Sequence, residues 1–174
     1  MMEHIIPDYP YALGICRIEP ENNIHVIIEA FQEELPIRLV MVGNWLNSDY
    51  GRELYDKCRE LPSVSAFTPI YDQSYLSKLR SGCTLYLHGH SCGGTNPSLV
   101  EAMYHSLAIA AFDVNFNRET TENKAFYFKT PQELREVIKN TSQEELLSCA
   151  EKMGEVAKRR YTWQRISELY AGLF

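Results

Sequence analysis

The residues from Leu85 to Met103 contain an apolar run, a loop of small residues and the start of a helix at Asn96-Pro97. A strand, a glycine-rich turn and a helix in this order present free backbone N–H groups and a positive helix end to an anion. Gly93 and Gly94 lack a Cβ, so the main chain can approach a phosphate closely. Glu101 lies just over one helical turn beyond Asn96. From there it can reach hydroxyls of the group to which the phosphate is attached. We interpret the segment as a cradle for a nucleotide diphosphate.

The same turn has other interpretations. Glycine-rich turns join strands to helices in many sheets that bind nothing, and a solvated Glu101 fits a helix surface. The spacing His88-Gly-His90-Ser-Cys92 suits metal ligands, but structural zinc sites use two separated ligand pairs, and the sequence holds no second pair. Cys92 is also a candidate nucleophile, with a neighbouring histidine as base, although a small cysteine filling a tight turn is the simpler interpretation. We expect no metal ion, and we expect His90 to contact a phosphate or a sugar hydroxyl.

Arg17 is the second candidate for anion binding. It ends the first expected strand, and in open parallel sheets ligands bind at the carboxyl ends of the strands. Its guanidinium fork can grip a diphosphate, but an ion pair with Glu19 or Glu21 fits equally well. We expect Asn22-Asn23 to cap the following helix. Asn117 lies in a polar loop after the fifth expected strand, which suits hydroxyl recognition.

Short apolar runs alternate with helical patterns along the chain, as expected for strands buried on both faces. Ile24, Ile27, Ile28 and Phe31 follow helical spacing in the first intervening segment. The alternation predicts right-handed βαβ crossovers, hence a Rossmann-like α/β domain with helices on both faces of a parallel sheet. The expected strands are Tyr11–Cys16, Arg38–Val42, Val64–Phe67, Thr84–His88, Ala108–Phe112 and Ala125–Phe128.

The C-terminal third is predicted to be a helical tail. Thr130–Glu133 and Ser142–Glu145 both have capping-box spacing, the first with proline at the first helical position. Thr162 is expected to cap a last helix whose apolar residues are Trp163, Ile166, Leu169, Tyr170 and Leu173.

The composition excludes several functional classes. The 174 residues suffice for one domain with a core, and 45% hydrophobic with 23% charged residues is ordinary for a globular protein. A net charge of −6 argues against nucleic-acid binding and against a polybasic membrane patch. Five cysteines without a CxxC pair favour a reducing cytoplasm. No run reaches membrane-spanning length, and the early first strand suits a domain cut from a longer chain.

Together these residues resemble the C-terminal, nucleotide-sugar-binding half of GT-B glycosyltransferases of the retaining family 4 type, over nearly the whole chain. In that family the first strand ends Gly-Arg-x-x-x-x-Lys-Gly before a helix, and this sequence runs from Cys16-Arg17 to Asn22-Asn23. The second strand runs into Val-Gly, as at Val42-Gly43. The family hallmark is a glutamate, seven residues, then Glu-Ala-Met, and its second half matches Glu101-Ala102-Met103.

The resemblance implies that Arg17 holds the diphosphate and Glu101 binds ribose hydroxyls, which makes these two the candidate catalytic residues. The amides around Gly94 would meet the phosphates. Base contact is expected from the loop after the third strand. The full set of expected ligand contacts is Arg17, Ile70, Tyr71, His90, Gly93, Gly94, Thr95, Asn96, Glu101 and Asn117.

The sequence departs from the family pattern at three positions. Gly93 stands where the hallmark has its first glutamate, so the carboxylate that contacts the donor sugar is missing. Asn22 replaces the diphosphate lysine, and Pro97 has no N–H to offer a phosphate. His90, Asn96 or Asn117 would then take over the sugar contact. The motif Pro20-Glu-Asn-Asn23, together with the run from His88 to Ser98, resembles a variant subgroup of bacterial rhamnosyl- or galactosyl-type transferases of capsule and exopolysaccharide assembly.

We therefore expect residues 1–174 to be the donor-binding domain of a glycosyltransferase that moves a sugar from a UDP- or dTDP-linked donor to a saccharide or lipid-linked acceptor. GT-B enzymes hold the acceptor in an N-terminal domain, which we expect outside this chain, so the domain alone should catalyse little. The expected location is the cytoplasm, at the inner face of the membrane. The alternatives are a non-catalytic module that binds a phosphorylated ligand, a Cys92-dependent hydrolase and a nucleotide-sugar epimerase.

Overall fold

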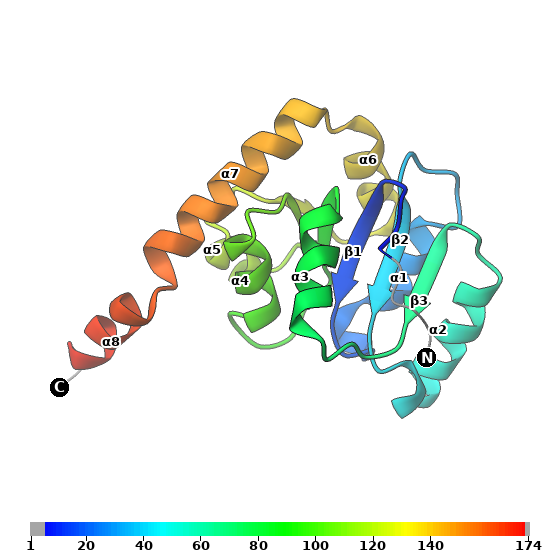
Figure 1. The fold of residues 1–174 in the computed structure, drawn as a ribbon, viewed down its shortest axis with the longest axis horizontal. Helices are drawn as coiled ribbons and strands as arrows, with labels where there is room; N and C mark the ends of the chain where they lie inside the picture. The colour runs from blue at the N-terminus through cyan, green and yellow to red at the C-terminus, as the bar shows by residue number, and fades with distance from the viewer. Residues whose placement is uncertain (1–5, 173–174) are drawn as a thin grey trace.

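The computed structural model of the protein describes residues 6–172, apart from the side chains of Trp163, Ile166, Leu169 and Tyr170. A parallel sheet of six strands in the order β3-β2-β1-β4-β5-β6 forms its centre (Figure 1). Each expected strand is present, with bounds within one residue of the prediction. The strands are β1 (Tyr11–Ile15), β2 (Arg38–Val42), β3 (Val64–Phe67), β4 (Leu85–His88), β5 (Ile109–Phe112) and β6 (Phe126–Phe128).

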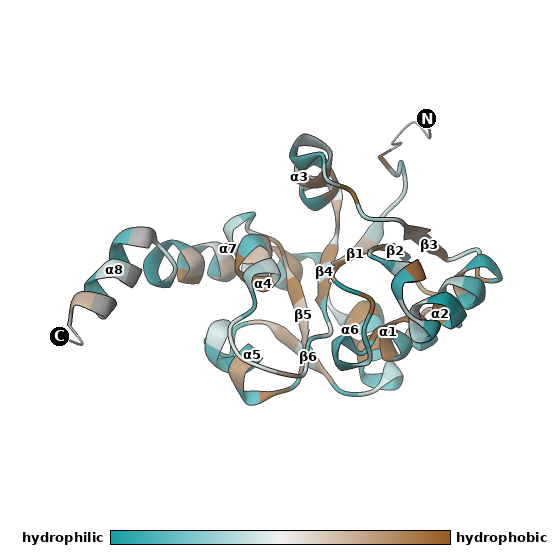
Figure 2. Cartoon of the chain, turned by 90° about the horizontal axis from the view of Figure 1, so that it is seen from below, coloured by the Kyte–Doolittle hydropathy of each residue, from teal (hydrophilic) through white to brown (hydrophobic). Residues whose placement is uncertain are grey.

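Helices cover both faces of the sheet, which confirms the predicted α/β fold class. Figure 2 shows α1, α2 and α6 on one side of the strands and α3 on the other, the side that α4 and α7 also cover. The helices are η1 (Pro20–Asn22), α1 (Ile24–Ala30), η2 (Trp45–Asn47), α2 (Asp49–Arg59), α3 (Gln73–Gly82), α4 (Pro97–Tyr104), α5 (Asn115–Thr120), α6 (Pro131–Asn140), α7 (Gln143–Arg160) and α8 (Trp163–Ala171).

The strands are apolar because both faces of the sheet are covered. Leu13, Val40, Tyr86 and Ala110 on the four central strands are fully buried. In Figure 2 the hydrophobic colour follows the strands, whereas the outer surfaces of the helices are hydrophilic. The continuous apolar runs in the sequence are therefore typical of parallel strands inside a three-layer domain.

The topology changes direction at the centre of the sheet. Leu13 of β1 pairs with Val40 of β2 on one side and with Tyr86 of β4 on the other. From β1 the chain moves outward through β2 and β3, then returns to the opposite side of β1 as β4. The loops after β1 and β4 therefore lead to opposite faces of the sheet. This switch point leaves a crevice between the two loops, where open α/β sheets bind ligands.

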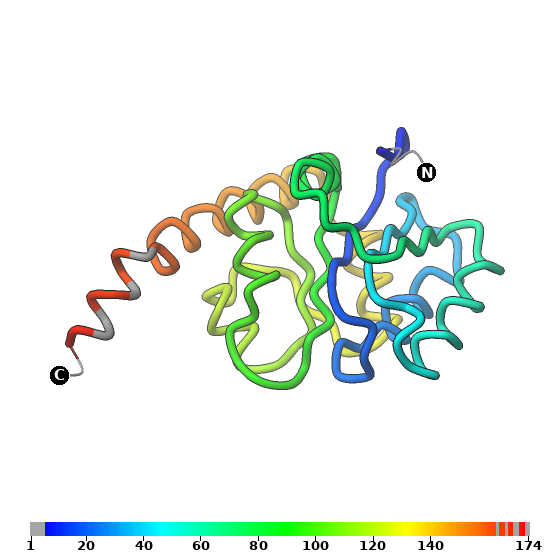
Figure 3. The backbone as a smooth tube through the Cα atoms, turned by 60° about the horizontal axis from the view of Figure 1, so that its bottom comes forward, coloured from blue at the N-terminus to red at the C-terminus, as the bar shows by residue number. Residues whose placement is uncertain are grey.

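The C-terminal helices begin as the sequence predicts. Thr130 with Glu133, and Ser142 with Glu145, form reciprocal capping boxes at α6 and α7. The Thr162 hydroxyl accepts a hydrogen bond from the N–H of Arg165 at 3.2 Å, which confirms the predicted cap of α8. Figures 1 and 3 show α8 at the far end of α7, away from the sheet. The predicted apolar face of this helix, Trp163, Ile166, Leu169, Tyr170 and Leu173, lies outside the described residues.

Two local predictions were wrong. The polar segment after β5 forms the short helix α5 rather than a loop. The side chains of Asn22 and Asn23 do not cap α1: Asn23 occupies the N-cap position with φ 50°, and its side chain makes no capping hydrogen bond. Both amide side chains bind to the neighbouring loop after β4 instead, so long-range contacts take precedence over the local capping preference of asparagine.

The backbones of the loops after β1 and β4 come close together at Gly89. A Cβ at Gly89 would overlap the backbone oxygen of Asn22, whereas a Cβ at Gly94 would meet no atom within 4 Å. We expect Gly89→Ala to destabilise the fold by about 1–3 kcal/mol, because backbone cannot yield as a side chain can. Gly94→Ala is the matched control and should leave the unfolding midpoint in urea unchanged. Equal midpoints for the two variants would contradict this packing.

Candidate functional site

A cavity of about 420 Å³ opens at the switch point, at the carboxyl ends of β1 and β4. Its wall includes Arg17 and Asn22 from the loop after β1, His90 from the loop after β4, and Glu101 from α4. A second cavity of about 350 Å³ lies beside it, and the two share Ile15, Cys16 and Arg17 as lining residues. The two cavities thus form one cleft along the strand ends, with Arg17 at their junction.

Two asparagines join the walls of this cleft. Asn22 Oδ1 accepts a hydrogen bond from His90 Nδ1 at 2.8 Å, and Asn22 Nδ2 donates to the carbonyl of Arg17 at 2.7 Å. Asn23 Nδ2 donates to the carbonyl of Gly89 at 2.9 Å and to Ser91 Oγ at 2.8 Å. Because these bonds connect residues about seventy positions apart in the sequence, they fix the loops after β1 and β4 relative to each other.

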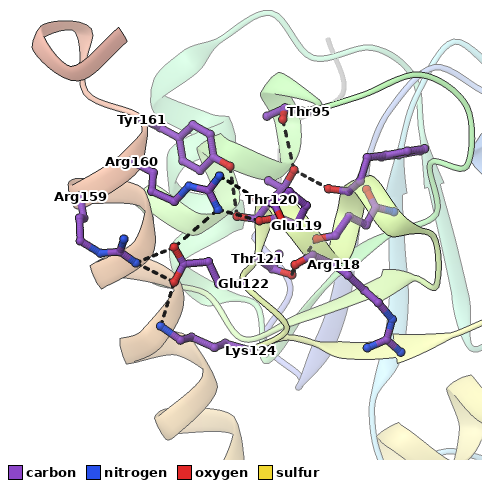
Figure 4. A network of polar contacts seen from close by, with 12 residues as sticks. Thr95, Arg118, Glu119, Thr120, Thr121, Glu122, Lys124, Arg159, Arg160 and Tyr161 are labelled. Atoms are coloured by element: carbon purple, nitrogen blue, oxygen red, sulfur yellow. Dashed lines mark hydrogen bonds and ion pairs between the residues drawn. The ribbon is translucent and has the colours of Figure 1, made fainter. Parts of the chain in front are cut away.

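The far side of the glycine-rich loop is held by α5. Asn117 is fully buried, and its Nδ2 donates to the carbonyls of His90 at 2.8 Å and Phe112 at 2.9 Å. The hydroxyls of Thr95 and Thr120 lie 3.3 Å apart (Figure 4). Asn117 therefore supports the cleft from behind and does not line it, so the predicted direct sugar contact would require this side chain to move.

The C-terminal end of α7 anchors this support (Figure 4). Arg159 Nη2 donates to both carboxylate oxygens of Glu122 at 2.6 Å, and Lys124 lies 3.0 Å from the same carboxylate. These contacts, the Arg159 bond first, lower the pKa of Glu122 to about 2. Arg160 binds Glu119 at 3.0 Å. The network ties the end of α7 to the segment that carries Asn117.

The loop presents unused amides at the start of α4. Asn96 Oδ1 caps the helix by accepting from the N–H of Ser98 at 2.9 Å. In the described part of the chain no hydrogen bond uses the backbone N–H of Gly93, Gly94 or Thr95, and all three residues are exposed. Gly93 has φ +107°, which residues with a Cβ rarely adopt. The loop is therefore shaped for close approach by an acceptor-rich group.

Arg17 lies at the junction of the two cavities but is paired with a neighbour. Its Nη1 lies 3.1 Å from Glu19 Oε1, and 71% of the side chain is exposed. The second oxygen of Glu19 is buried without a hydrogen-bond partner. Surface ion pairs contribute little free energy, so an incoming polyanion can displace Glu19 from the guanidinium. The sequence analysis offered two alternatives for Arg17, a position in the cleft and an ion pair with a nearby glutamate. The structure shows both.

Glu101 has a partner that the sequence analysis missed. Arg80 of α3 donates from Nη2 to Glu101 Oε2 at 2.6 Å, and only 6% of the arginine side chain is exposed, against 59% of Glu101. Arg80 follows Leu79 in a helical pattern and carries no local signal of a functional role. Only the packing of α3 beside α4 brings it to Glu101.

The histidines of the cleft are not charged at neutral pH. Burial lowers the pKa of His88 to about 3, and its Nε2 has no hydrogen-bond partner. Partial burial also lowers the pKa of His90. Because His90 Nδ1 must donate to the side-chain oxygen Oδ1 of Asn22, Nε2 of the neutral ring is a hydrogen-bond acceptor. Burial raises the pKa of Cys16 in the cleft wall to about 12, so this thiol stays protonated.

The predicted contacts fall into three groups. Arg17, His90, Asn96 and Glu101 line the larger cavity together. Ile70 and Tyr71 line the smaller one, and Tyr71 is 86% exposed. The remaining predicted contacts lie on the exposed loop (Gly93, Gly94 and Thr95) or, in the case of Asn117, behind it.

The sequence analysis also considered a metal site and a nucleophilic Cys92, and the geometry of the described residues gives little support to either. Among residues 6–172, no three histidine, cysteine, aspartate or glutamate side chains gather as metal ligands would. Within the same range, no hydrogen bond connects Cys92 to His88 or His90. None of the described helices combines the length and apolar character needed to span a bilayer.

Comparison with known proteins identifies the family. The sequence matches the glycosyl transferases group 1 family over residues 3–160. The chain belongs to this family. The same comparison found no curated protein that matches this sequence.

Solved structures share the fold of the group 1 domain. HepE from Anabaena, in complex with UDP-glucose, has a TM-score of 0.79 and 20% identity, covering 94% of this chain and 49% of that one. Sucrose-phosphate synthase from Thermosynechococcus elongatus has a TM-score of 0.81 and 17% identity, covering 96% of this chain and 46% of that one. The chain thus spans about half the length of these proteins and matches one half of a GT-B fold.

A third structure has a similar length. The C-terminal domain of LpcC, a glycosyl transferase group 1 family protein from Francisella tularensis, has a TM-score of 0.72 and 18% identity, covering 90% of this chain and 89% of that one. In fold, this chain therefore resembles a domain that was solved by itself.

His88 gives the domain a measurable dependence on pH. Its folded pKa of about 3 lies below the value near 6.5 of an exposed histidine, so acid protonates the unfolded chain first. Stability from this group is therefore lost as pH falls below about 6.5. Between pH 7.5 and 5, wild type should lose about 2 kcal/mol more unfolding free energy than His88→Gln in urea titrations. Equal losses would show that His88 is protonated freely in the folded state.

Proposed function

We propose that this domain binds the nucleotide-diphosphate sugar of a retaining, family 4 type glycosyltransferase and stabilises the departing diphosphate. The observation that carries the proposal is the arrangement around the cleft. Arg17 and the first residues of α4 line the larger cavity, and the free amides of Gly93, Gly94 and Thr95 lie on the exposed loop that leads into α4. Backbone N–H groups and a guanidinium together fit the charge and the many acceptor atoms of a pyrophosphate.

The reaction follows from what the cleft can stabilise. The bond between the anomeric carbon and the diphosphate oxygen breaks, and the electron pair leaves with the diphosphate. The acceptor hydroxyl forms the new bond to that carbon from the face of the leaving group, and its proton passes to the departing diphosphate oxygen. Arg17 and the helix end stabilise the charge that grows on the diphosphate, so the proposed step needs no metal ion.

His90 is the proposed substitute for the missing glutamate of the family motif. A Cβ at Gly93 would lie 3.5 Å from His90 Nε2, so the imidazole stands beside the point where that glutamate side chain would begin. Its Nε2 is an acceptor, as a carboxylate oxygen would be. We assign this nitrogen to a hydroxyl of the donor sugar, which narrows the earlier choice between phosphate and sugar.

The nucleoside would then extend past Glu101 toward the smaller cavity. Glu101 is placed to accept from the hydroxyls of the nucleoside sugar, and Ile70 with Tyr71 offers an apolar surface for the base. HepE and the trehalose-6-phosphate protein from E. coli are similar in fold and were solved with UDP-sugars, which makes UDP the first nucleotide to test. A dTDP-linked donor is the second choice.

The role of the whole enzyme is part of the proposal. The chain covers about half the length of the structures it resembles, and we assign acceptor binding to a further domain. The proposed acceptor is a saccharide or lipid-linked saccharide in surface polysaccharide synthesis, with rhamnosyl or hexosyl transfer at the cytoplasmic side of the membrane. We expect the domain alone to bind nucleotide and to transfer little.

Calorimetric titration with UDP, dTDP and GDP tests the proposal. Arg17→Ala and Glu101→Ala should each weaken the binding of the tightest nucleotide about tenfold or more, because each removes a hydrogen bond involving a charged group. Arg59→Ala is the matched control, since its side chain is 72% exposed, as Arg17 is at 71%, and it lies on α2, outside the cleft. An absence of binding by the wild-type domain, or equal effects of Arg17→Ala and Arg59→Ala, would contradict the proposal.

A further inference from the structure

Arg80 carries a charge in an unusual place. It lies near the end of α3, and 94% of its side chain is removed from solvent, since only 6% is exposed. Its Nε is buried without a hydrogen-bond partner. Removing a guanidinium from water is costly unless a counter-charge lies in contact. The buried position of Arg80 therefore requires an anion beside its side chain.

Glu101 is that anion. In the described part of the chain it is the single carboxylate within ion-pair distance of Arg80, with Oε2 at 2.6 Å from Nη2. Burial lowers the pKa of the neighbouring His105, and the Arg80 charge lowers it further, so this histidine adds no charge near neutral pH. The contact is a charge-assisted hydrogen bond in a partly dry environment, which is stronger than a bond between neutral groups.

The pair leaves half of the carboxylate available. Oε1 of Glu101 makes no hydrogen bond in the described part of the chain, 59% of the side chain is exposed, and Glu101 lines the larger cavity. One oxygen is thus anchored by a buried donor, and the other is free on a side chain that lines the cavity. A free glutamate on a helix surface would lose rotamer entropy on gripping a ligand, whereas this one has lost much of it beforehand.

We propose that Arg80 is a positioning residue that orients Glu101 toward a hydroxyl of the nucleoside sugar, and so makes the cleft discriminate nucleotides by that hydroxyl. This inference rests on the proposed function, because it assumes that a nucleotide occupies the cleft. Arg80 does not touch the ligand. It acts through Glu101, from a different helix and from 21 positions earlier in the sequence.

The test measures discrimination rather than affinity alone. Calorimetry gives the affinity of the tightest of UDP, dTDP and GDP, and of its 3′-deoxy form, which lacks one sugar hydroxyl. Wild type should prefer the complete nucleotide by about tenfold or more, as expected for a hydrogen bond to a charged acceptor. In Glu101→Gln and in Arg80→Met the preference should fall below about threefold, because the acceptor loses its charge in the first variant and is no longer held in the second.

Two further variants separate positioning from simple charge. Lys78→Met removes an exposed cation from the same helix and should keep the wild-type preference. Arg80→Lys keeps the charge but shortens the donor, and its preference should fall at least about threefold. If circular dichroism shows that Arg80→Met does not fold, Arg80→Lys replaces it as the test of the role of Arg80.

The outcomes are distinct. No nucleotide binding by wild type would overturn the proposed function itself. Wild-type binding without any preference for the complete nucleotide, or an unchanged preference in Arg80→Met and Arg80→Lys, would overturn the role of Arg80 and leave nucleotide binding intact. Loss of affinity for both nucleotides in the same proportion would show that Arg80 acts as a distant charge, which also contradicts positioning.

Discussion

The cleft depends on the bonds by which Asn22 and Asn23 connect the loops after β1 and β4. At a switch point these loops diverge, and sheet hydrogen bonding does not hold them together. The asparagine side chains reach His90, Gly89 and Ser91 across the gap. They satisfy polar groups of the loops without using the amides of Gly93, Gly94 and Thr95. The result is an exposed loop of free donors beside the cleft that is already in place before a ligand arrives, which reduces the entropy cost of binding.

The same division of roles recurs around the cleft. Residues with buried side chains hold their neighbours in place, and residues with exposed groups remain available to contact a ligand. Asn117 holds the carbonyl of His90 from behind, while the loop amides face outward. Arg80 is buried and binds one oxygen of Glu101, which lines the cavity and keeps its second oxygen free. Among the lining residues, charge is concentrated on Arg17 and Glu101, because His88 and His90 are neutral at physiological pH.

Local sequence patterns predicted the fold well. The apolar runs located all six strands, and the pattern Thr-Pro-x-Glu at Thr130 and the Ser142–Glu145 spacing marked two helix starts, because these signals depend on neighbouring residues alone. The glycines also predicted the turn between β4 and α4. Side-chain roles set by distant contacts were not predictable in this way. Asn22 and Asn23 fit a helix cap locally, and Arg80 fits a helix surface, until the packing of the sheet brings their partners within reach.

The most direct test of the account is a crystal structure of the domain with UDP. The account predicts pyrophosphate oxygens within about 3 Å of the amide nitrogens of Gly93, Gly94 or Thr95, with Arg17 turned from Glu19 to the phosphate. The bonds of Asn22 to His90 and of Asn23 to Gly89 should be unchanged from the free protein. A diphosphate bound away from these amides, or loops that separate to admit it, would contradict the claim that the joined loops form the binding site.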